Sequence, residues 1–383
     1  MSRLKQLAEH PVTQRAFRSP FVRRLTTQLV AAQRAPEDLV TPYRSWAELD
    51  AHGPVPLVAR EHGDALDIAF VVPGFRRGSG GHTTISNLVR GLEARGHMCS
   101  IWIDDPLGHS GGAANFRAFF GPFAATVHDD LRGWRGAGVA VATGWQTVAT
   151  VLRLERCGAR AHLVQDDEPE FYPASAERLW AERAFQLPTI TAGTWLAERM
   201  RAKGLAATPF DLGIDHATYH PQPGVTRVPN RVLFYARAAT PRRAVPLGLL
   251  ALEALQARRS VEIVLFGDAA PLAAPFAFTN LGILDPPAVA RAYNEAGAGL
   301  VLSLTNHSLV AQEMVACGLP AVELRTPSTE AAFAGAPIAL ADPTPQAIAD
   351  ALERQLDAPA ATGDWAATRT WAAAAAAVES ALR

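Results

Sequence analysis

The stretch DIAFVVPGFRRGSGGHTTISNLVRGLEARGHMCSIWI, residues 67–103, decides the fold. It begins and ends with short apolar runs of the kind that form buried parallel strands. Between them, an apolar face repeats at helical spacing from Thr83 to Arg95, and Gly96 closes the helix. The stretch therefore predicts one strand–helix–strand unit of a parallel sheet.

The same alternation continues along the chain in two series, separated by residues 206–230, which are dense in proline and glycine. The other expected strands are Val139–Ala142, His162–Val164, Thr189–Thr191, Arg231–Tyr235, Val261–Phe266, Phe278–Leu281, Gly299–Leu302 and Ala321–Leu324, with helices over Pro246–Arg258, Pro286–Ala296 and Ser308–Cys317. We therefore predict two doubly wound, Rossmann-like α/β domains facing a cleft, with an N-terminal helical extension.

The expected boundaries follow from these patterns. Residues 1–60 form the extension, 61–220 an acceptor-side domain and 221–363 a donor domain. A last helix over residues 364–383 can cross back to the first domain.

Composition limits the classes of function. The chain has 383 residues, and its 36 basic and 37 acidic residues give a net charge of -1, so no global attraction to nucleic acid is expected. Its three cysteines are far apart, which suggests neither a zinc site nor a disulfide framework. No apolar run reaches the roughly 18 residues of a membrane span, and no signal peptide is evident. We expect a cytoplasmic protein.

The leader is locally basic up to residue 35. Ser19-Pro20 is a helix start signal, and Phe21, Leu25 and Leu29 then form an apolar stripe. This stripe packs on the protein's own body or contacts the inner face of a membrane, where each basic residue near anionic lipid contributes about 1 kcal/mol.

Two loops that directly follow predicted strands carry cationic and small residues. The first, residues 73–82, combines Arg76 and His82 with four glycines, so a ligand can approach its backbone and the following helix start. The second contains Arg237, Arg242 and Arg243, whose guanidinium groups are suited to a diphosphate. In both cases a solvated surface loop is the alternative.

Two more motifs contain side chains that can accept hydrogen bonds, and one of them also starts a helix. Residues 306–308 cap a helix whose second turn contains Glu313, which is placed to accept hydrogen bonds from ribose hydroxyls. Gln165, Asp166, Asp167 and Glu168 follow a strand of the first domain and are suited to bind acceptor hydroxyls or to assist their deprotonation. A solvated loop is again the alternative for the acidic segment.

In this order the motifs resemble the retaining nucleotide-sugar glycosyltransferases of the GT-B fold, family four. The resemblance covers about residues 66–355 and rests on Gly78–Gly81, Arg95–His97, Arg237 with Arg242, Leu265–Asp268 and Glu313–Pro320. The strings FYARAATPRR (234–243), NLGILDPPAVARAYNEA (280–296) and SLTNHSLVAQEMVACGLP (303–320) resemble the bacterial branch that uses dTDP-rhamnose-type donors to build cell-surface polysaccharide.

The resemblance implies transfer of a sugar from a nucleoside diphosphate to a saccharide or lipid-linked saccharide, with retention and without a metal or other cofactor. The residues that we assign to the donor are Gly80, Gly81, Arg237, Arg242, Arg243, Gly267, Asn306, His307, Ser308, Leu309 and Glu313. Asp166, Glu168 and His82 are the catalytic candidates, and Gln165, Asp167 and Arg76 are assigned to the acceptor.

One position departs from the family pattern. The family has two glutamates separated by seven residues; Glu313 matches the second, but Thr305 occupies the position of the first, which normally contacts the donor sugar. A deoxysugar donor is consistent with this loss. Two alternatives remain, a noncatalytic sugar-nucleotide or glycan-binding subunit and a GT-B-fold sugar epimerase.

Overall fold

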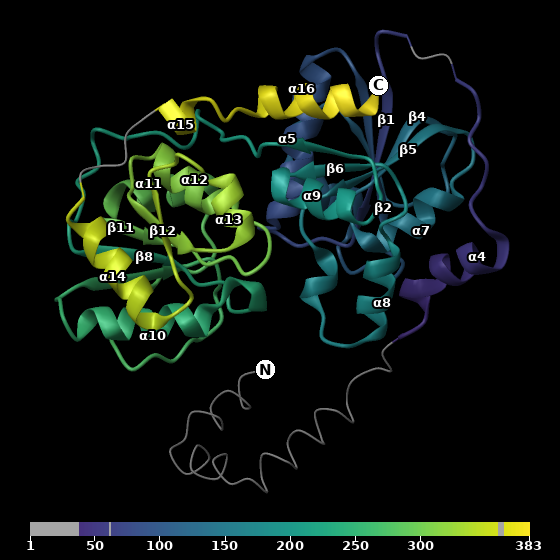
Figure 1. Ribbon diagram of the computed structural model, residues 1–383. Helices are drawn as coiled ribbons and strands as arrows, with labels where there is room; N and C mark the ends of the chain where they lie inside the picture. Colours follow the sequence, from purple (N-terminus) through teal and green to yellow (C-terminus); the bar gives the residue numbers. More distant parts are fainter. Residues whose placement is uncertain (1–37, 61–62, 359–363) are drawn as a thin grey trace, which may run out of the picture. The chain divides into compact units, whose positions relative to one another are not determined.

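The computed structural model of the protein describes residues 38–60, 63–358 and 364–383 (Figure 1). The chain forms two compact units, Met1–Arg44 and Ser45–Arg383. Most of the first unit, including the helix expected after Ser19-Pro20, lies outside the described residues. Ahead of the first strand come the 3-10 helix η1 (Thr41–Tyr43) and α4 (Arg44–His52). In the part of the chain that is described, no helix is long and apolar enough to cross a membrane.

The first α/β domain is built on a parallel sheet with the strand order β3-β2-β1-β4-β5-β6-β7. Its strands are β1 (Asp67–Pro73), β2 (Met98–Asp104), β3 (Thr126–His128), β4 (Ala137–Ala142), β5 (Cys157–Val164), β6 (Thr189–Ala192) and β7 (Ala207–Phe210). Ile68 to Val72 are completely buried, as a central parallel strand requires. All five strands expected here are confirmed, whereas β3 and β7, which lie at the edges of the sheet, were not expected.

Helices lie in most of the connections between the strands of this domain. They are α5 (Gly80–Ala94), α6 (Gly112–Phe120), α7 (Trp145–Arg153), η2 (Glu168–Phe171), α8 (Ala176–Arg183) and α9 (Thr194–Ala202). Helix α5 begins at Gly80 and not at Thr83, so the expected start is wrong by three residues. Ser79 is the extended N-cap, and the glycines after it take part in the first turn although they carry no apolar face.

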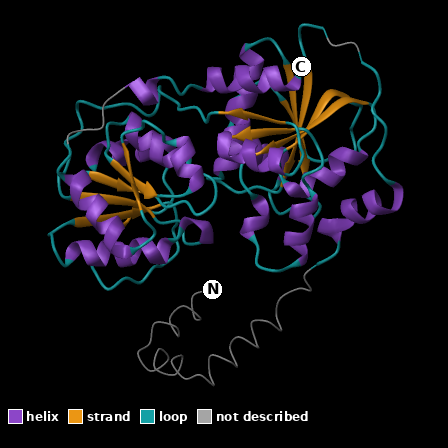
Figure 2. Ribbon diagram, viewed as in Figure 1, coloured by secondary structure: helices purple, strands orange, loops and turns teal. Residues whose placement is uncertain are grey.

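The second α/β domain repeats the design with the order β10-β9-β8-β11-β12-β13, again all parallel (Figure 2). Its strands are β8 (Arg231–Tyr235), β9 (Glu262–Phe266), β10 (Thr279–Asn280), β11 (Ala298–Leu300), β12 (Ala321–Leu324) and β13 (Ile338–Ala341). Its helices are η3 (Pro241–Arg243), α10 (Val245–Gln256), α11 (Pro286–Glu295), α12 (Leu309–Ala316), α13 (Pro327–Ala332) and α14 (Pro345–Leu356). The prediction of two doubly wound α/β domains is confirmed.

The C-terminal segment contains two helices, α15 (Asp364–Ala367) and α16 (Trp371–Leu382), where one continuous helix was expected. The interruption occurs because Thr370 is extended, forms a β-bridge with Ile214, and caps α16 through its hydroxyl. Helix α16 lies against α5 of the first domain (Figure 1). A Cβ on Gly91 would come within 2.5 Å of the Ala375 Cβ, so this glycine permits the close crossing.

Candidate functional site

Both sheets reverse their strand order at one point. In the first sheet β1 lies between β2 and β4, and in the second β8 lies between β9 and β11. Loops that leave the carboxyl ends of the two central strands at such a point diverge and leave room for a ligand. The loops after β1, β8 and β11 contain the glycine-rich, arginine-rich and Asn306 motifs, so the topology places these motifs where a ligand is expected.

The three arginines after β8 are each held by a different group. The Arg237 Nη1 donates to the Gly78 carbonyl of the glycine-rich loop at 2.8 Å. Arg242 forms an ion pair from Nε to Asp166 Oδ2 at 3.3 Å, and its guanidinium lies 4.0 Å from the centre of the Phe171 ring.

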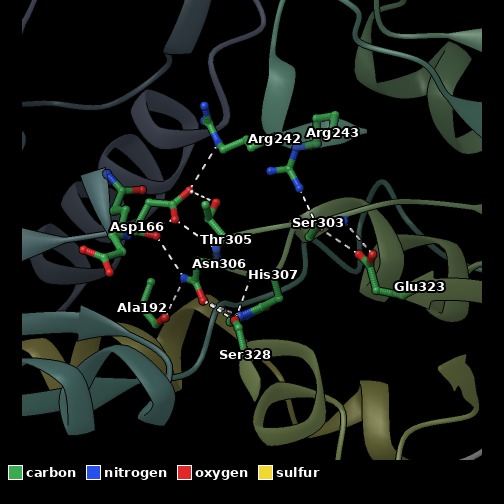
Figure 3. A network of polar contacts seen from close by, with 12 residues as sticks. Asp166, Ala192, Arg242, Arg243, Ser303, Thr305, Asn306, His307, Glu323 and Ser328 are labelled. Carbon is green, nitrogen blue, oxygen red and sulfur yellow. Dashed lines mark hydrogen bonds and ion pairs between the residues drawn. The ribbon is translucent and has the colours of Figure 1, made fainter. Parts of the chain in front are cut away.

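Arg243 turns the other way and donates from Nη1 to the Ser303 hydroxyl at 2.5 Å (Figure 3). The three guanidinium groups therefore come from one loop but have fixed and separate positions.

The loop after β11 ends in the cap of α12. The Ser308 hydroxyl accepts from the Val310 N–H at 3.3 Å, and Leu309 is the first helical residue, so the expected cap is confirmed. Within the loop the Asn306 side chain is 2% exposed. Its amide donates to the carbonyls of Gln165 and Ala192, each at 2.9 Å, and its oxygen accepts from Ser328 Oγ at 2.7 Å (Figure 3). Asn306 thus joins the loop to two strand ends of the first domain.

His307 follows Asn306 and is also buried. Burial lowers its pKa to about 4, so the ring is neutral near pH 7. Its Nδ1 lies 3.1 Å from the Asn306 oxygen, and a Cβ on Gly193 would lie 3.1 Å from its Cε1. His307 therefore packs between the loop and the end of β6 as a neutral group.

Asp166 is the acidic centre of this network. Its Oδ1 accepts from the main-chain N–H groups of Asn306 and Asp167, both at 2.9 Å, and its Oδ2 accepts from the Thr305 hydroxyl at 3.1 Å. The Arg242 Nε lies 3.3 Å from the same Oδ2. A carboxylate has about four acceptor positions, so the contacts in the structure engage all of those on Asp166.

The neighbouring residues have distinct environments. Asp167 is buried and forms an ion pair with Arg199 of α9. The Gln165 side chain lies 3.4 Å from the position that a Cβ on Gly81 would take, so it faces the start of α5.

Glu168 differs from the other acids because its carboxylate lies at the start of α7. Its Oε2 accepts from the Trp145 N–H at 2.6 Å. Burial raises the pKa of Glu168 to about 8, and the charges of Asp166 and Asp167 act in the same direction. A carboxyl group with a pKa in this range exchanges protons near neutral pH, as a general acid or base must.

In the glycine-rich loop, His82 points into the protein. Its Nδ1 lies 2.8 Å from Ser79 Oγ, and its ring packs among Phe75, Phe116 and Phe120. Burial lowers the pKa of His82 to about 4. Arg76, in contrast, is exposed. Of the residues expected in this loop, Gly80, Gly81 and His82 form the first turn of α5, and the neutral ring of His82 points into the protein.

The remaining expected donor residues lie on the second domain. Glu313 is half-buried in α12, where its Oε2 accepts from the Tyr293 hydroxyl at 3.4 Å, and burial raises its pKa to about 8. Gly267 follows β9 with φ +102°, and a Cβ there would come within 2.5 Å of Tyr235 Cε2. Only glycine fits this position without a shift of the ring.

Sequence reasoning missed two parts of the network. Glu323 is a completely buried carboxylate of β12 that accepts from both the N–H and the hydroxyl of Ser303, and Ser328 bonds both Asn306 and the His307 N–H. The signal for Glu323 was an acidic residue within the apolar strand Ala321–Leu324. Ser328 gave no comparable signal.

The chain is similar in sequence to a known family of proteins and to a curated relative. The profile of the family described as "WsaF, C-terminal domain" matches residues 230–353, which is the second domain. A curated relative, the O-antigen biosynthesis protein RfbC of Myxococcus xanthus, is 31% identical over 221 residues, which cover 55% of this chain and 17% of that protein. The chain thus spans less than a fifth of the length of its curated relative.

Among solved structures, a glycosyltransferase from Rickettsia africae aligns with a TM-score of 0.56 at 11% identity, covering 84% of this chain and 95% of that one. Anabaena HepE, solved in complex with UDP, aligns with a TM-score of 0.54 at 13% identity, covering 82% and 94%. The fold is GT-B. At these identities the likeness establishes the architecture, and the GT-B domains correspond to the two sheets described above.

Proposed function

We propose that the protein is a glycosyltransferase that moves a sugar from a nucleoside diphosphate to a saccharide hydroxyl, with retention, in the synthesis of a cell-surface polysaccharide. The observation that carries this proposal is the loop after β8, which leaves the reversal point of the second sheet with three arginines. Arg237 contacts the Gly78 carbonyl, Arg242 pairs with Asp166, and Arg243 reaches Ser303 of the 303–308 loop. The name of the curated relative, an O-antigen biosynthesis protein, supports the polysaccharide class.

The leaving group explains the cationic loop. Departure of a nucleoside diphosphate develops negative charge on the phosphate oxygens, and fixed guanidinium groups and the N-terminus of α12 stabilise that charge. In this proposal these groups supply the positive charge, and no metal or other cofactor takes part. Glu313 would accept hydrogen bonds from the ribose hydroxyls.

The acceptor would bind at the carboxyl end of the first sheet. Glu168 lies there, and burial raises its pKa to about 8, so it is our candidate to exchange the acceptor proton. Gln165 and Arg76 would orient the acceptor. We further propose a 6-deoxysugar donor such as dTDP-rhamnose, because Thr305 presents a single hydroxyl, already bonded to Asp166, where the family has a carboxylate.

We place this reaction in the cytoplasm. The acceptor would be a free or lipid-linked saccharide, and the basic leader would touch the inner face of the membrane. Salt-sensitive binding to anionic vesicles that is lost when residues 1–37 are removed is the expected result for the leader. Equal binding by both proteins would contradict this part of the proposal.

A panel of dTDP-, UDP- and GDP-sugars tests the reaction. We expect one donor to raise the thermal unfolding midpoint and to release diphosphate only when a saccharide acceptor is present. Release without acceptor would indicate an epimerase, and binding without release would indicate a noncatalytic subunit.

In the variant Arg237→Ala, the donor should no longer raise the thermal unfolding midpoint. Arg291→Ala is the matched control, because Arg291 is an exposed arginine of α11 paired with Glu295. Equal donor binding by both variants would contradict the diphosphate assignment.

A further inference from the structure

Glu323 is a buried carboxylate for which the proposed reaction has no direct use. Its side chain is 0% exposed and belongs to β12, next to the central strands of the second sheet. Val322 and Leu324 on either side pack into the core beneath α10 and α14. Because side chains alternate along a strand, Glu323 points to the opposite face. Such a group needs compensating partners, and these identify its role.

Glu323 bonds Ser303 at the point where the main-chain hydrogen bonds between β11 and β12 stop. Gly299 N–H donates to the Pro320 carbonyl and Val301 N–H to the Val322 carbonyl, so Ser303 N–H would next donate to the Leu324 carbonyl. Ser303 N–H donates instead to Glu323 Oε1 at 2.8 Å.

The Leu324 carbonyl accepts instead from the Thr329 hydroxyl at 2.5 Å. The Glu323 carboxylate therefore fixes the main chain at the point where β11 turns into the 303–308 loop.

The second oxygen extends the connection to the arginine loop. Glu323 Oε2 accepts from the Ser303 hydroxyl at 2.9 Å, and that hydroxyl in turn accepts from Arg243 Nη1 at 2.5 Å (Figure 3). The Ser303 hydroxyl has one proton, which it gives to Glu323, so its lone pairs are available to Arg243. An ionised Glu323 thus orients the hydroxyl that holds the guanidinium.

We propose that Glu323 is a positioning residue that acts through Ser303 to hold Arg243 for a diphosphate ligand. The inference rests on the proposed function, because it assigns Arg243 to the donor diphosphate. It adds the role of Glu323, a strand residue that touches no ligand but whose charge would affect the affinity for the donor.

The charges around Glu323 make this connection sensitive to pH. Burial raises the pKa of Glu323 to about 7, and the bonds from Leu324 and Ser303 and the charge of Arg243 oppose the rise. The titratable residues of the adjoining elements face other partners: Glu313 of α12 accepts from Tyr293, and Glu330 of α13 and Asp342 after β13 pair with Arg325. Arg243 is therefore the charge that Glu323 faces through Ser303.

The test measures binding of UDP and dTDP by calorimetry to the full chain and to the variants Glu323→Gln and Ser303→Ala. Glutamine keeps the size and the acceptor oxygen but removes the charge. We expect each variant to weaken diphosphate binding about fivefold to tenfold at pH 8, since a pre-organised guanidinium binds with a smaller entropic cost. In the Ser303→Ala background, Glu323→Gln should have no further effect.

The pH dependence of binding distinguishes an orienting role of Glu323 from a merely structural one. If Glu323 orients Arg243, the affinity ratio between wild type and Glu323→Gln should approach one as the pH falls to about 6, because the wild-type carboxyl becomes protonated. A merely structural role predicts a ratio that does not change with pH. The matched control is Glu330→Gln, which removes an exposed carboxylate of α13 and should leave binding unchanged.

The outcomes separate the two claims. Unchanged or tighter diphosphate binding by Glu323→Gln, additive effects of the two substitutions, or a ratio independent of pH would each overturn the inference and leave the proposed function standing. Failure of the wild-type protein to bind any nucleoside diphosphate would overturn both.

Discussion

Asn306→Ala should be one of the most damaging single substitutions at the candidate site. The Asn306 side chain is 2% exposed and has four contacts: donated bonds to the Gln165 and Ala192 carbonyls, an accepted bond from Ser328 Oγ, and the contact with His307 Nδ1 at 3.1 Å. Alanine removes all four contacts and leaves the partners enclosed. At about 1 kcal/mol for each bond, with a further penalty for partners left unsatisfied, the expected loss in free energy of unfolding is about 3 to 5 kcal/mol.

The nearly isosteric Asn306→Asp separates hydrogen bonding from volume. Its carboxylate would face two carbonyl oxygens without donating to them, so protonation is favoured in the folded state and the pKa of the new carboxyl rises. A raised folded pKa means that stability falls as the pH rises from the unfolded pKa, about 4, to the folded one. We expect this variant to lose at least as much stability as Asn306→Ala at pH 7 and to recover part of it at pH 5.

Urea unfolding followed by tryptophan fluorescence measures both variants. Asn280→Ala is the control, because Asn280 is an exposed asparagine of the same domain whose side chain also makes two bonds to the main chain. It should lose less than about 1 kcal/mol. If Asn306→Ala lost no more than this control, or if Asn306→Asp were as stable as wild type at pH 7, the network around Asn306 would not hold the loop in the way described.

Three further predictions concern the remaining site residues. Gly267→Ala should lose about 2 to 3 kcal/mol in urea unfolding, because φ is +102° and the new Cβ would meet Tyr235, whereas Gly335→Ala, with positive φ but open space, should lose about 1 kcal/mol. Burial raises the pKa of Glu168 from 4.5 to about 8, so the free energy of unfolding of the wild-type protein should decrease as the pH rises from 4.5 to 8. The free energy of unfolding of Glu168→Gln should decrease less over the same range, and parallel pH profiles of the two proteins would refute this. The pKa of Glu313 is also about 8, so UDP affinity should rise between about pH 7 and pH 9 as its carboxylate forms, and Glu313→Gln should abolish that rise in calorimetry.

The architecture was predictable because it depends on local patterns. Buried parallel strands are short apolar runs, and each of the ten expected strands is present, some with shifted ends. The edge strands β3 (Thr126–His128) and β7 (Ala207–Phe210) were missed because they are short and less apolar, and β7 contains Pro209. The break before α16 was missed because Thr370 is extended by a bridge to Ile214, a contact that is distant in sequence.

The chemistry of the site was less accessible from the sequence. The loops themselves were identified, since arginines and glycines after strands are visible in the sequence. Which group holds each side chain was not, because Asp166 meets Thr305 and Asn306 across about 140 residues of sequence. The residue type alone makes His82 a catalytic candidate, but its environment among phenylalanines depends on helix α6, which no pattern in the sequence predicts.

The positive charges of the arginine loop after β8 are balanced by nearby acids, as the basic and acidic residues of the whole chain nearly balance. Each guanidinium there has an acid close by: Arg242 pairs with Asp166, and Arg243 reaches Glu323 through Ser303. The charge of Arg237 contributes to lowering the pKa of Asp268, after the two N–H groups that bond that carboxylate. At pH 8, where Glu323 is ionised, the cluster is therefore compensated before any ligand binds, and a diphosphate would be held by the fixed directions of the N–H groups more than by a net positive field.

This compensation predicts a shallow salt dependence. Ions screen the field of exposed net charge, but they have little effect on short hydrogen bonds within a neutral cluster. At pH 8 the Kd for UDP should therefore change less than about fivefold between about 50 and 500 mM NaCl. Asp166→Asn, which leaves Arg242 without its acid, should steepen that dependence, while Glu330→Gln, remote from the loop, should not. A steep dependence in the wild-type protein would mean that the acids do not neutralise the arginines, and that attraction by net charge, not pre-organisation, gives this loop its affinity.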